Sequence, residues 1–588
     1  MLDRCSGLLF AVSLLAAAPA AAQCTMRKIA ELPVTMEGLR PMVPATINGT
    51  DVKFIADSGA FLSIISPSIA TQLGLTLEKM PIGFRLQAIG GSAPTAKTQV
   101  RDFALNGTNI PNVEFLVGGS DTGRAGLLGL NVLSVGDAEY DLAGGAIRLF
   151  RTPGCGGSRL AYWAGDRHVS ALEMLETDPH NRHIVGLVTI NGARLRAVFD
   201  TGAPRSMMTL EAARNAGVTP QSPKARADGT SRGLGPNVTR SWIAPFDNFS
   251  IGDEQIQNAR LRFSEMPGFS FDMLLGADFF LSHRIFVSTS TGRIFLTYNG
   301  GAVFDRSGTV KLPGNAPAGA DPQADTAASL DADGLVRRGA ASAARRDFPN
   351  AIRDLNRAIE LAPNEPRYRY ARAAAYRAAG QLSLARLDLD SALALKPDYV
   401  EALIDRAAIF LATSARSAGL SDLDAAARIA PNGGNVHMAL AELYVRTDSF
   451  DAAIWEYGRW LATHGPQDSR YSQALNGRCW ARTALGRDLD QALADCNAAV
   501  RAAPDAAGYR DSRGLTYLRM GDYARAIADY DEALKLQPKI AWSLYGRGIA
   551  KQHKGRKDEG DEDIAAALAI DPTVADQMRR YRIIKGVQ

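Results

Sequence analysis

Hydrophobic and polar positions form two different patterns along this chain. Between residues 26 and 300, short apolar runs such as 53–56 and 114–117 alternate with Asn-Gly, Gly-Gly and Gly-Ser turn residues. Apolar runs of this length, bounded by such residues, predict β-strands. From residue 334 onward the sequence is rich in alanine and its pattern becomes helical and periodic. We therefore expect a β-rich first half and an all-helical second half.

The β-rich half contains an internal duplication. Three elements occur twice in the same order: Thr-Ile-Asn-Gly at 46–49 and 189–192, Asp-[Ser/Thr]-Gly-Ala at 57–60 and 200–203, and Leu-Leu-Gly at 127–129 and 274–276. The distance from the aspartate to the later glycine is 72 residues in the first copy and 76 in the second. A duplicated fold explains this agreement better than coincidence. It predicts two lobes, 26–152 and 183–300, with an inter-lobe linker at 153–182.

Each copy places an aspartate at the end of an apolar strand. The hydroxyl that follows the aspartate can donate to the opposite lobe, and the next glycine lets backbone amides approach the carboxylate. One Asp-Thr-Gly alone would be a weak signal, because such tripeptides are usually turns. Two copies with matching surroundings are a strong one. The predicted catalytic residues are Asp57 and Asp200, and the supporting turn residues are Ser58, Gly59, Ala60, Thr201, Gly202 and Ala203.

On these motifs the chain resembles the retropepsin-like aspartyl proteases, specifically the bacterial gag-polyprotein-type family, present here in tandem over roughly residues 40–150 and 183–298. The resemblance implies two small β-barrel lobes whose aspartates face each other across a substrate cleft. Two carboxylates about 3 Å apart share one proton, so one serves as general base on water while the other polarises the scissile carbonyl. No metal or cofactor is expected, since the seven histidines form no His-Glu-x-x-His motif.

Two details refine this hypothesis. Alanine follows the glycine in both copies, at Ala60 and Ala203, where a serine could stabilise the charged carboxylate. The absence of a serine predicts raised pKa values for the two aspartates and activity that reaches toward neutral pH. A pH–rate profile that peaks below about pH 4 would contradict this prediction. Flexible segments after each aspartate predict flaps that cover the substrate, although surface hairpins would look similar. The flap glycines are Gly90, Gly91, Gly229 and Gly233.

The second half carries a repeat of 34 residues, visible in the spacing of Pro363, Pro397 and Pro431 and of three later prolines. This period resembles the tetratricopeptide repeat, and it predicts about seven helix pairs in an array over 334–588. The sequence departs from the 34-residue spacing around residues 435–466. Arginines precede aspartates by sixteen residues, or by seventeen in one repeat, which predicts an ion-pair ladder between paired helices or, alternatively, a grip on an acidic peptide. The pairs are Arg338–Asp354, Arg372–Asp388, Arg406–Asp422, Arg478–Asp495, Arg513–Asp529 and Arg547–Asp563.

The N-terminus and the cysteines indicate export. Arg4 precedes an apolar stretch that ends in small residues, as in a cleaved signal peptide over 1–22, so we expect a periplasmic or secreted protein. A retained anchor would need a longer apolar run, and Gln23 disfavours lipid attachment at Cys24. The four remaining cysteines allow three connectivities, of which co-location favours Cys24–Cys155 and Cys479–Cys496; buried free thiols are the alternative.

Composition limits the kinds of molecule that we expect the chain to bind. A net charge of +4 over 588 residues gives no support for nucleic-acid binding, and a Pro/Gly/Ala-rich stretch predicts a flexible linker at 301–333. We expect no membrane span in the mature chain. The first hypothesis is an exported aspartic endopeptidase acting on a peptide or protein substrate, with the array recruiting a protein partner. The alternatives are an inactive peptide-binding module on a repeat scaffold, or lobes that pair between chains.

Overall fold

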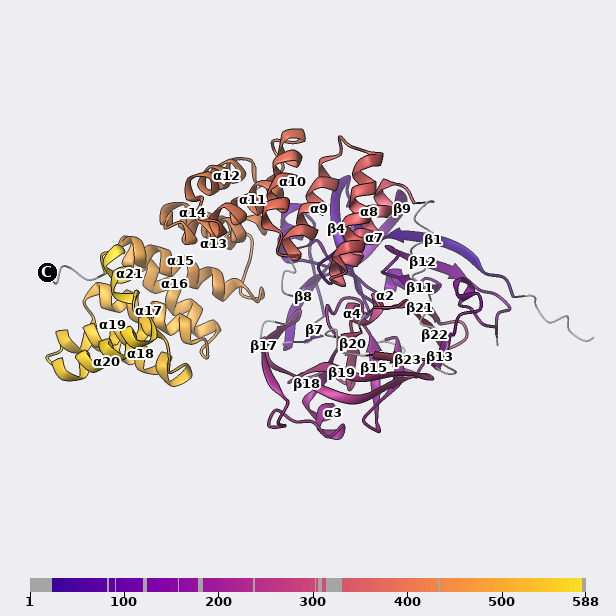
Figure 1. Cartoon of the computed structure of the whole chain (residues 1–588), viewed down its shortest axis with the longest axis horizontal. Helices are drawn as coiled ribbons and strands as arrows, with labels where there is room; N and C mark the ends of the chain where they lie inside the picture. The colour runs from indigo at the N-terminus through magenta and orange to yellow at the C-terminus, as the bar shows by residue number, and fades with distance from the viewer. Residues whose placement is uncertain are drawn as a thin grey trace, which may run out of the picture.

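The computed structural model describes residues 24–588 except 82–83, 90, 120–123, 157, 178–182, 236–237, 302, 305–308, 313–329, 432–433 and 584–588. The predicted signal peptide at 1–22 lies outside the described residues. A β-rich unit of two lobes comes first, and a curved array of helices follows it (Figure 1). This arrangement confirms the predicted fold class. None of the described helices has the length and apolarity needed to cross a bilayer.

Lobe 1 is a nine-stranded sheet that closes on itself, because β3 pairs with β4 on one side and with β8 on the other. The closed barrel has the strand order β3-β4-β10-β5-β9-β8. Two short helices, α1 (Pro67–Gln72) and α2 (Leu130–Leu133), complete it. The strands are β2 (Thr35–Glu37), β3 (Arg40–Ile47), β4 (Thr50–Ala56), β5 (Ile64–Ile65), β6 (Glu78–Lys79), β7 (Arg85–Ala88), β8 (Gly91–Leu105), β9 (Thr108–Gly118) and β10 (Gly126–Leu128).

Lobe 2 repeats this barrel with the equivalent order β14-β15-β20-β16-β19-β18, closed by pairing of β18 with β14. In both lobes the Leu-Leu-Gly strand pairs in parallel with the strand that leads to the aspartate. The strands are β14 (Val185–Ile190), β15 (Ala193–Phe199), β16 (Met207–Thr209), β17 (Arg226–Arg232), β18 (Val238–Ile251), β19 (Glu254–Ser264), β20 (Met273–Leu275) and β23 (Thr309–Lys311), with helices α3 (Leu210–Asn215) and α4 (Ala277–Phe280).

The duplicated Thr-Ile-Asn-Gly elements form the tight turns between β3 and β4 and between β14 and β15. Asn48 and Gly49 have φ values of 49° and 78°, and Asn191 and Gly192 have 48° and 86°. Two successive residues with positive φ make the turn type that matches the twist of a two-residue hairpin. Asparagine and glycine adopt this conformation at low cost. The turns therefore fix the register of the strands that carry the aspartates.

A six-stranded sheet beneath the barrels joins the two lobes. It contains β1 (Arg27–Pro33), β12 (Ala146–Arg151), β11 (Asp137–Asp141), β21 (His283–Ser288), β22 (Arg293–Tyr298) and β13 (Ser170–Glu173), in that spatial order. The lobes meet where β11 pairs antiparallel with β21. The stretch predicted as an inter-lobe linker, 153–182, differs from that prediction, since it supplies the helical turn η1 (Tyr162–Ala164) and β13 to this base.

Seven antiparallel helix pairs and one final helix form the array within the described residues. The helices are α7 (Ala332–Ala344), α8 (Phe348–Leu361), α9 (Pro366–Ala378), α10 (Leu382–Leu395), α11 (Val400–Ala412), α12 (Arg416–Ile429), α13 (Val436–Arg446), α14 (Phe450–Leu461), α15 (Tyr471–Leu485), α16 (Leu489–Ala502), α17 (Ala507–Met520), α18 (Tyr523–Leu536), α19 (Ala541–His553), α20 (Lys557–Ile570) and α21 (Val574–Arg580). The predicted number of pairs is confirmed.

The predicted ion-pair ladder is also confirmed. In all six predicted pairs the guanidinium donates to both carboxylate oxygens at 2.6–2.8 Å. In the irregular stretch 435–466, His437 Nδ1 and Glu456 Oε2 lie 2.6 Å apart instead, both buried. Each pair thus ties the two helices of one repeat together, so the structure favours the ladder over a grip on an acidic peptide.

Both predicted disulfides are present. Cys24 is bonded to Cys155 and thereby ties the start of the described chain to the end of lobe 1. Cys479 is bonded to Cys496 across the helices α15 and α16.

The first helix of the array packs against lobe 1. Helix α7 contacts β2, and Ala341 of α7 is fully buried in the core that both barrels share. The stretch predicted as a flexible linker, 301–333, differs in part, because β23 within it pairs with β19 and α7 begins at Ala332. The array is thus attached to the β-rich unit through a packed helix.

Candidate active site

The two aspartates stand at equivalent positions in the two lobes. Asp57 follows β4 and Asp200 follows β15, and the last three residues of each strand are buried. Their backbone N–H groups donate to Leu128 O and Leu275 O, both at 2.9 Å. The Leu-Leu-Gly strands therefore hold both aspartates at the point where the buried strands end.

Backbone amides of each turn hydrogen-bond to its own carboxylate. In both lobes the second and third residues after the aspartate donate to one carboxylate oxygen, which favours the ionised form. These bonds are Gly59 and Ala60 to Asp57 Oδ1 (2.9 Å each), and Gly202 and Ala203 to Asp200 Oδ1 (2.9 and 3.0 Å). The alanines thus act through their backbone N–H groups, which any residue except proline could supply.

A reciprocal set of hydrogen bonds joins the two turns. The Ser58 N–H donates to Thr201 Oγ1 and the Thr201 N–H donates to Ser58 Oγ, each at 3.0 Å. The Ser58 hydroxyl then donates to Phe199 O at 2.8 Å, and the Thr201 hydroxyl to Ala56 O at 2.7 Å. Both hydroxyl residues are fully buried. Because every donor crosses to the opposite lobe, the two turns are fixed against each other.

This arrangement brings the two carboxyl groups into contact within one chain. A Cβ atom placed on Gly59 would lie 2.3 Å from Asp200 Cγ, and one placed on Gly202 would lie 2.2 Å from Asp57 Cγ. Each carboxyl group therefore packs directly on the glycine of the opposite turn. The two groups also hydrogen-bond to each other, which requires that one of them carries a proton.

Burial raises the pKa of both aspartates. For Asp57 the negative charge of Asp200 and the hydrogen bond with it raise the pKa further, well above the usual range. For Asp200 the hydrogen bonds from Asp57 and from backbone amides offset part of this increase, and its pKa remains raised. The two carboxyl groups therefore share one proton. The raised pKa values agree with the prediction made from Ala60 and Ala203. Their main cause, however, is burial.

The comparisons with known proteins agree with this geometry. The aspartyl protease family matches the chain twice, over residues 43–132 and 187–279. These two segments are aspartyl protease lobes. Two tetratricopeptide repeat families match residues 336–400 and 512–540. No curated protein matches the chain.

Several solved structures are similar to part of the chain. A tetratricopeptide repeat protein from Parabacteroides merdae is 18% identical, covers 42% of this chain and 98% of its own, with a TM-score of 0.33. The hetero-tetramer Cut9–Hcn1 of the APC/C is 17% identical, with 43% and 50% coverage and a TM-score of 0.31. YrrB, described as having an unusual peptide-binding site, is 15% identical, with 38% and 96% coverage and a TM-score of 0.24. Scores this low carry no argument about function.

The sequence did not lead us to predict a second pair of equivalent residues, Asn131 and Asp278, which support the turns that carry the aspartates. Asn131 Oδ1 accepts from the N–H and hydroxyl of Ser63 at 2.8 and 2.7 Å, and Asp278 Oδ1 accepts from the N–H and hydroxyl of Ser206 at the same distances. Each serine Oγ in turn accepts from the glycine N–H of Leu-Leu-Gly at 3.0 Å. Extending the alignment of the two copies would have found them, since both serines lie six residues after the aspartate.

The predicted flaps meet across the protease lobes. Gly91 begins β8, Gly229 lies in β17 and Gly233 follows that strand, while Gly90 lies outside the described residues. The Gly235 N–H donates to Ile89 O at 3.0 Å, so the two hairpin ends touch.

Each flap reaches the opposite lobe. Ile89, from lobe 1, packs on an apolar cluster of lobe 2 that contains Val185 and Met207. Leu234, from lobe 2, packs on a cluster of lobe 1 that contains Ile64 and Leu116. These two clusters also include the turn residues Ala203 and Ala60, so they flank the aspartate pair.

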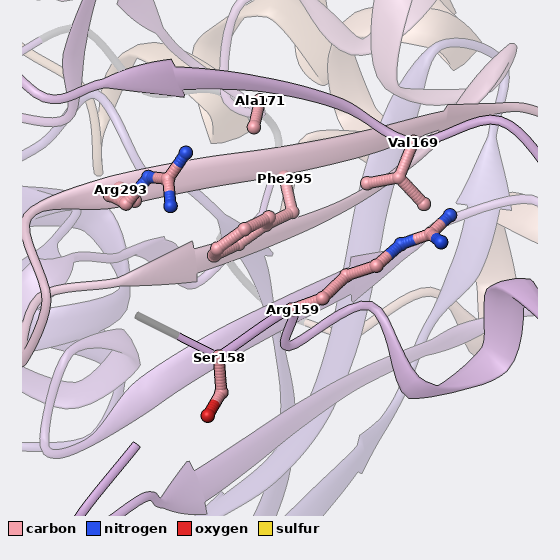
Figure 2. Close-up of a pocket in the computed structure, with 6 residues that line it drawn as sticks. All are labelled: Ser158, Arg159, Val169, Ala171, Arg293 and Phe295. Atoms are coloured by element: carbon pink, nitrogen blue, oxygen red, sulfur yellow. The ribbon is translucent and has the colours of Figure 1, made fainter. Parts of the chain in front are cut away.

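Two other features of the described residues were compared with the aspartate pair: metal-ligating groups and a cavity. Groups of three or more metal-ligating side chains are absent from the described part of the chain. A cavity of about 200 Å³ lies on the base sheet, where Arg293 of β22 stacks on Phe295 at 5.3 Å. Figure 2 shows the residues that line it: Ser158, Arg159, Val169, Ala171, Arg293 and Phe295. None of them belongs to the protease turns.

Proposed function

We propose that this chain is an aspartic endopeptidase that hydrolyses peptide bonds with Asp57 and Asp200. The observation that carries the proposal is the contact within one chain between the carboxyl groups of buried Asp57 and partly buried Asp200, which share a hydrogen bond. Two carboxyl groups in contact cannot both be ionised at low cost, so the pair holds one proton in its working state. A fixed pair of this kind supports acid–base chemistry on a peptide carbonyl.

A shared proton gives the two aspartates complementary roles. The ionised aspartate accepts a proton from the attacking water, and the protonated aspartate donates a hydrogen bond to the scissile carbonyl. The water oxygen bonds to the carbonyl carbon, and the amine then leaves with a proton from the pair. Because burial raises both pKa values, we expect activity to extend toward neutral pH.

We further propose export to the periplasm or the exterior. Support comes from the apolar N-terminal stretch and from two disulfides, Cys24–Cys155 and Cys479–Cys496, which persist in oxidising compartments. The tetratricopeptide repeats favour binding of another protein, so we assign to the array the recruitment of a substrate or partner.

Hydrolysis of a mixed peptide library between pH 3 and pH 8 tests the enzyme proposal. We expect cleavage by the unaltered chain and a loss of roughly 10²-fold to 10⁴-fold in Asp57→Asn, the range of general acid–base contributions. Asp247→Asn, an exposed aspartate of lobe 2, is the matched control and should cleave normally. Absence of cleavage by the unaltered chain at every pH would favour an inactive binding module.

A further inference from the structure

The end of the C-terminal helix α21 and the residue after it contact earlier repeats of the same array. Successive first helices of the pairs, including α15, α17 and α19, contact one another and so line the inside of the curve. Helix α21 contacts α19 and α20, the two helices of the last pair. The chain that follows this helix extends beyond the last pair to earlier repeats.

The residue after α21 reaches four repeats at once. The ring of Tyr581 lies 5.5 Å from Phe450, 5.7 Å from Trp480 and 6.1 Å from Trp542, measured between ring centroids. These rings belong to α14, α15 and α19. The Tyr581 carbonyl also accepts from Arg519 Nη1 of α17 at 2.8 Å. The side chain therefore sits in an aromatic site formed by helices that are distant in sequence.

A carboxylate completes this site. Asp448, in the turn between α13 and α14, accepts from the Tyr581 hydroxyl at 2.9 Å and from Arg580. Burial and the hydrogen bond to Asp448 raise the pKa of Tyr581 to about 12. The site thus pairs an aromatic pocket with a negative group, and its occupant presents an arginine followed by a tyrosine. We call Asp448, Phe450, Trp480, Arg519 and Trp542 the aromatic groove.

We infer that the aromatic groove docks a segment of a partner protein in which an arginine precedes an aromatic residue, and that the chain's own C-terminal segment occupies it as an internal competitor. The contacts of Arg580 and Tyr581 define the chemistry that the groove recognises: ring stacking, a hydroxyl donor and a cation for Asp448. An attached segment competes at a high effective concentration, so a partner binds when it makes more contacts than this short segment does.

The occupant can be weakened without removing the helix. Val574 and Met578 are fully buried and anchor α21 on the last pair of the array, whereas Tyr581 lies beyond the end of the helix. Tyr581→Ala therefore leaves the anchor in place while it empties the pocket. Arg579, next to the groove-binding Arg580, pairs with exposed Asp576 of the same helix. Arg579→Ala is thus a matched control for Arg580→Ala.

Fluorescence polarisation with a labelled peptide of residues 571–588 tests the inference on the full chain. We expect Tyr581→Ala and Arg580→Ala to bind the peptide at least tenfold more tightly than the unaltered chain, because the internal competitor is weakened. Arg579→Ala should bind like the unaltered chain. A peptide that itself carries Tyr581→Ala should bind the Tyr581→Ala chain at least tenfold more weakly, and so should the natural peptide when Asp448→Asn is added.

Three outcomes would overturn the inference. The Tyr581→Ala chain, with unchanged circular dichroism, could fail to bind the peptide. It could also bind the two peptides equally, which would make the segment a structural cap. Sedimentation of the unaltered chain could instead reveal dimers that disappear in Tyr581→Ala, which would assign the groove to a second copy. Peptide cleavage plays no part in these measurements, so they stand apart from the proposed protease activity.

Discussion

At the scale of single residues, the absence of a side chain at Gly59 and Gly202 is what lets the two carboxyl groups meet. An added methyl group would lie 2.3 Å from Asp200 Cγ or 2.2 Å from Asp57 Cγ, closer than any real contact. The clash falls on the opposite lobe's aspartate, which is itself held by hydrogen bonds. A substitution in one lobe would therefore leave the aspartate of that lobe in place and displace the aspartate of the opposite lobe.

We accordingly predict that Gly59→Ala and Gly202→Ala each reduce peptide cleavage by roughly 10²-fold or more, the scale at which a misplaced acid–base group costs catalysis. Gly156→Ala is the control, because Gly156 is exposed and a methyl group there meets nothing within 4 Å. Initial rates on one cleaved peptide measure the effect. Normal rates in either variant would show that the carboxyl groups lie further apart.

A second residue-scale prediction concerns Asp278, which occupies in lobe 2 the place of Asn131 in lobe 1. Burial raises the pKa of Asp278 despite the hydrogen bonds from Ser206. The folded chain therefore binds more protons than the unfolded chain between the two pKa values, and stability at this site falls as pH rises. Asparagine keeps the accepting oxygen, as Asn131 demonstrates, and does not titrate.

Asp278→Asn should thus raise the free energy of unfolding at pH 7 and leave it almost unchanged below about pH 3.5, where both states of the unaltered chain are protonated. Denaturant melts at the two pH values measure the difference. Asp247→Asn, exposed on the same lobe, should show no such pH dependence. A loss of stability at pH 7 in Asp278→Asn would mean that the carboxylate charge itself is needed.

At the scale of elements, a buried carboxylate holds neighbouring strands of the base sheet together. Glu139 of β11 is fully buried; Arg148 Nη1 of β12 donates to it at 2.6 Å and Arg284 Nε of β21 at 2.9 Å. The Tyr162 hydroxyl donates to it as well, at 2.5 Å. One residue therefore links both lobes and the segment between them.

Removing one partner of a buried ion pair leaves charge without compensation and costs about 3–5 kcal/mol. We predict a loss of that size in the free energy of unfolding for Glu139→Gln, measured by chemical denaturation. Glu173→Gln, exposed on β13 of the same sheet, should change it by less than about 0.5 kcal/mol. Equal effects of the two substitutions would show that the sheet does not depend on this cluster.

The crossed flaps lead to another element-scale prediction. Ile89 and Leu234 each pack on the apolar cluster of the opposite lobe, where substrate side chains beside the scissile bond would lie. Truncation of either to alanine should raise KM for a cleaved peptide by roughly 10-fold, the order expected from lost apolar contacts. Leu77→Ala, an exposed leucine of lobe 1, should leave KM unchanged. An unaltered KM in both flap variants would place the substrate elsewhere.

The sequence predicted repeated elements well and their assembly less well. The turns, the Leu-Leu-Gly strands and the ion-pair ladder recur at fixed spacing, so one copy supports the interpretation of the next. Nothing in the spacing indicated that β13, within the predicted linker, joins a sheet with β1 and β12. Long-range pairing of that kind depends on which edges remain open after each lobe folds, and a linear pattern does not encode it. The return of Tyr581 into the array escaped prediction for the same reason.

At the scale of the whole molecule, the protease lobes and the array share a packed boundary. Ala341 of α7 is buried in the core of the barrels, and a methyl group on Gly145 of lobe 1 would lie 2.6 Å from Arg337 Cβ. The orientation of the first repeat is therefore fixed relative to lobe 1. A partner held by the array would be held at a defined place relative to the aspartate pair.

The central claim is that Asp57 and Asp200 of one chain form one catalytic pair. Cleavage by an equimolar mixture of Asp57→Asn and Asp200→Asn chains, compared with each variant and with the unaltered chain, tests it most directly. Our account predicts that the unaltered chain cleaves peptides and that both variants and their mixture do not. Restored cleavage in the mixture would mean that the pair forms between chains, and full cleavage by either variant alone would contradict the proposed chemistry.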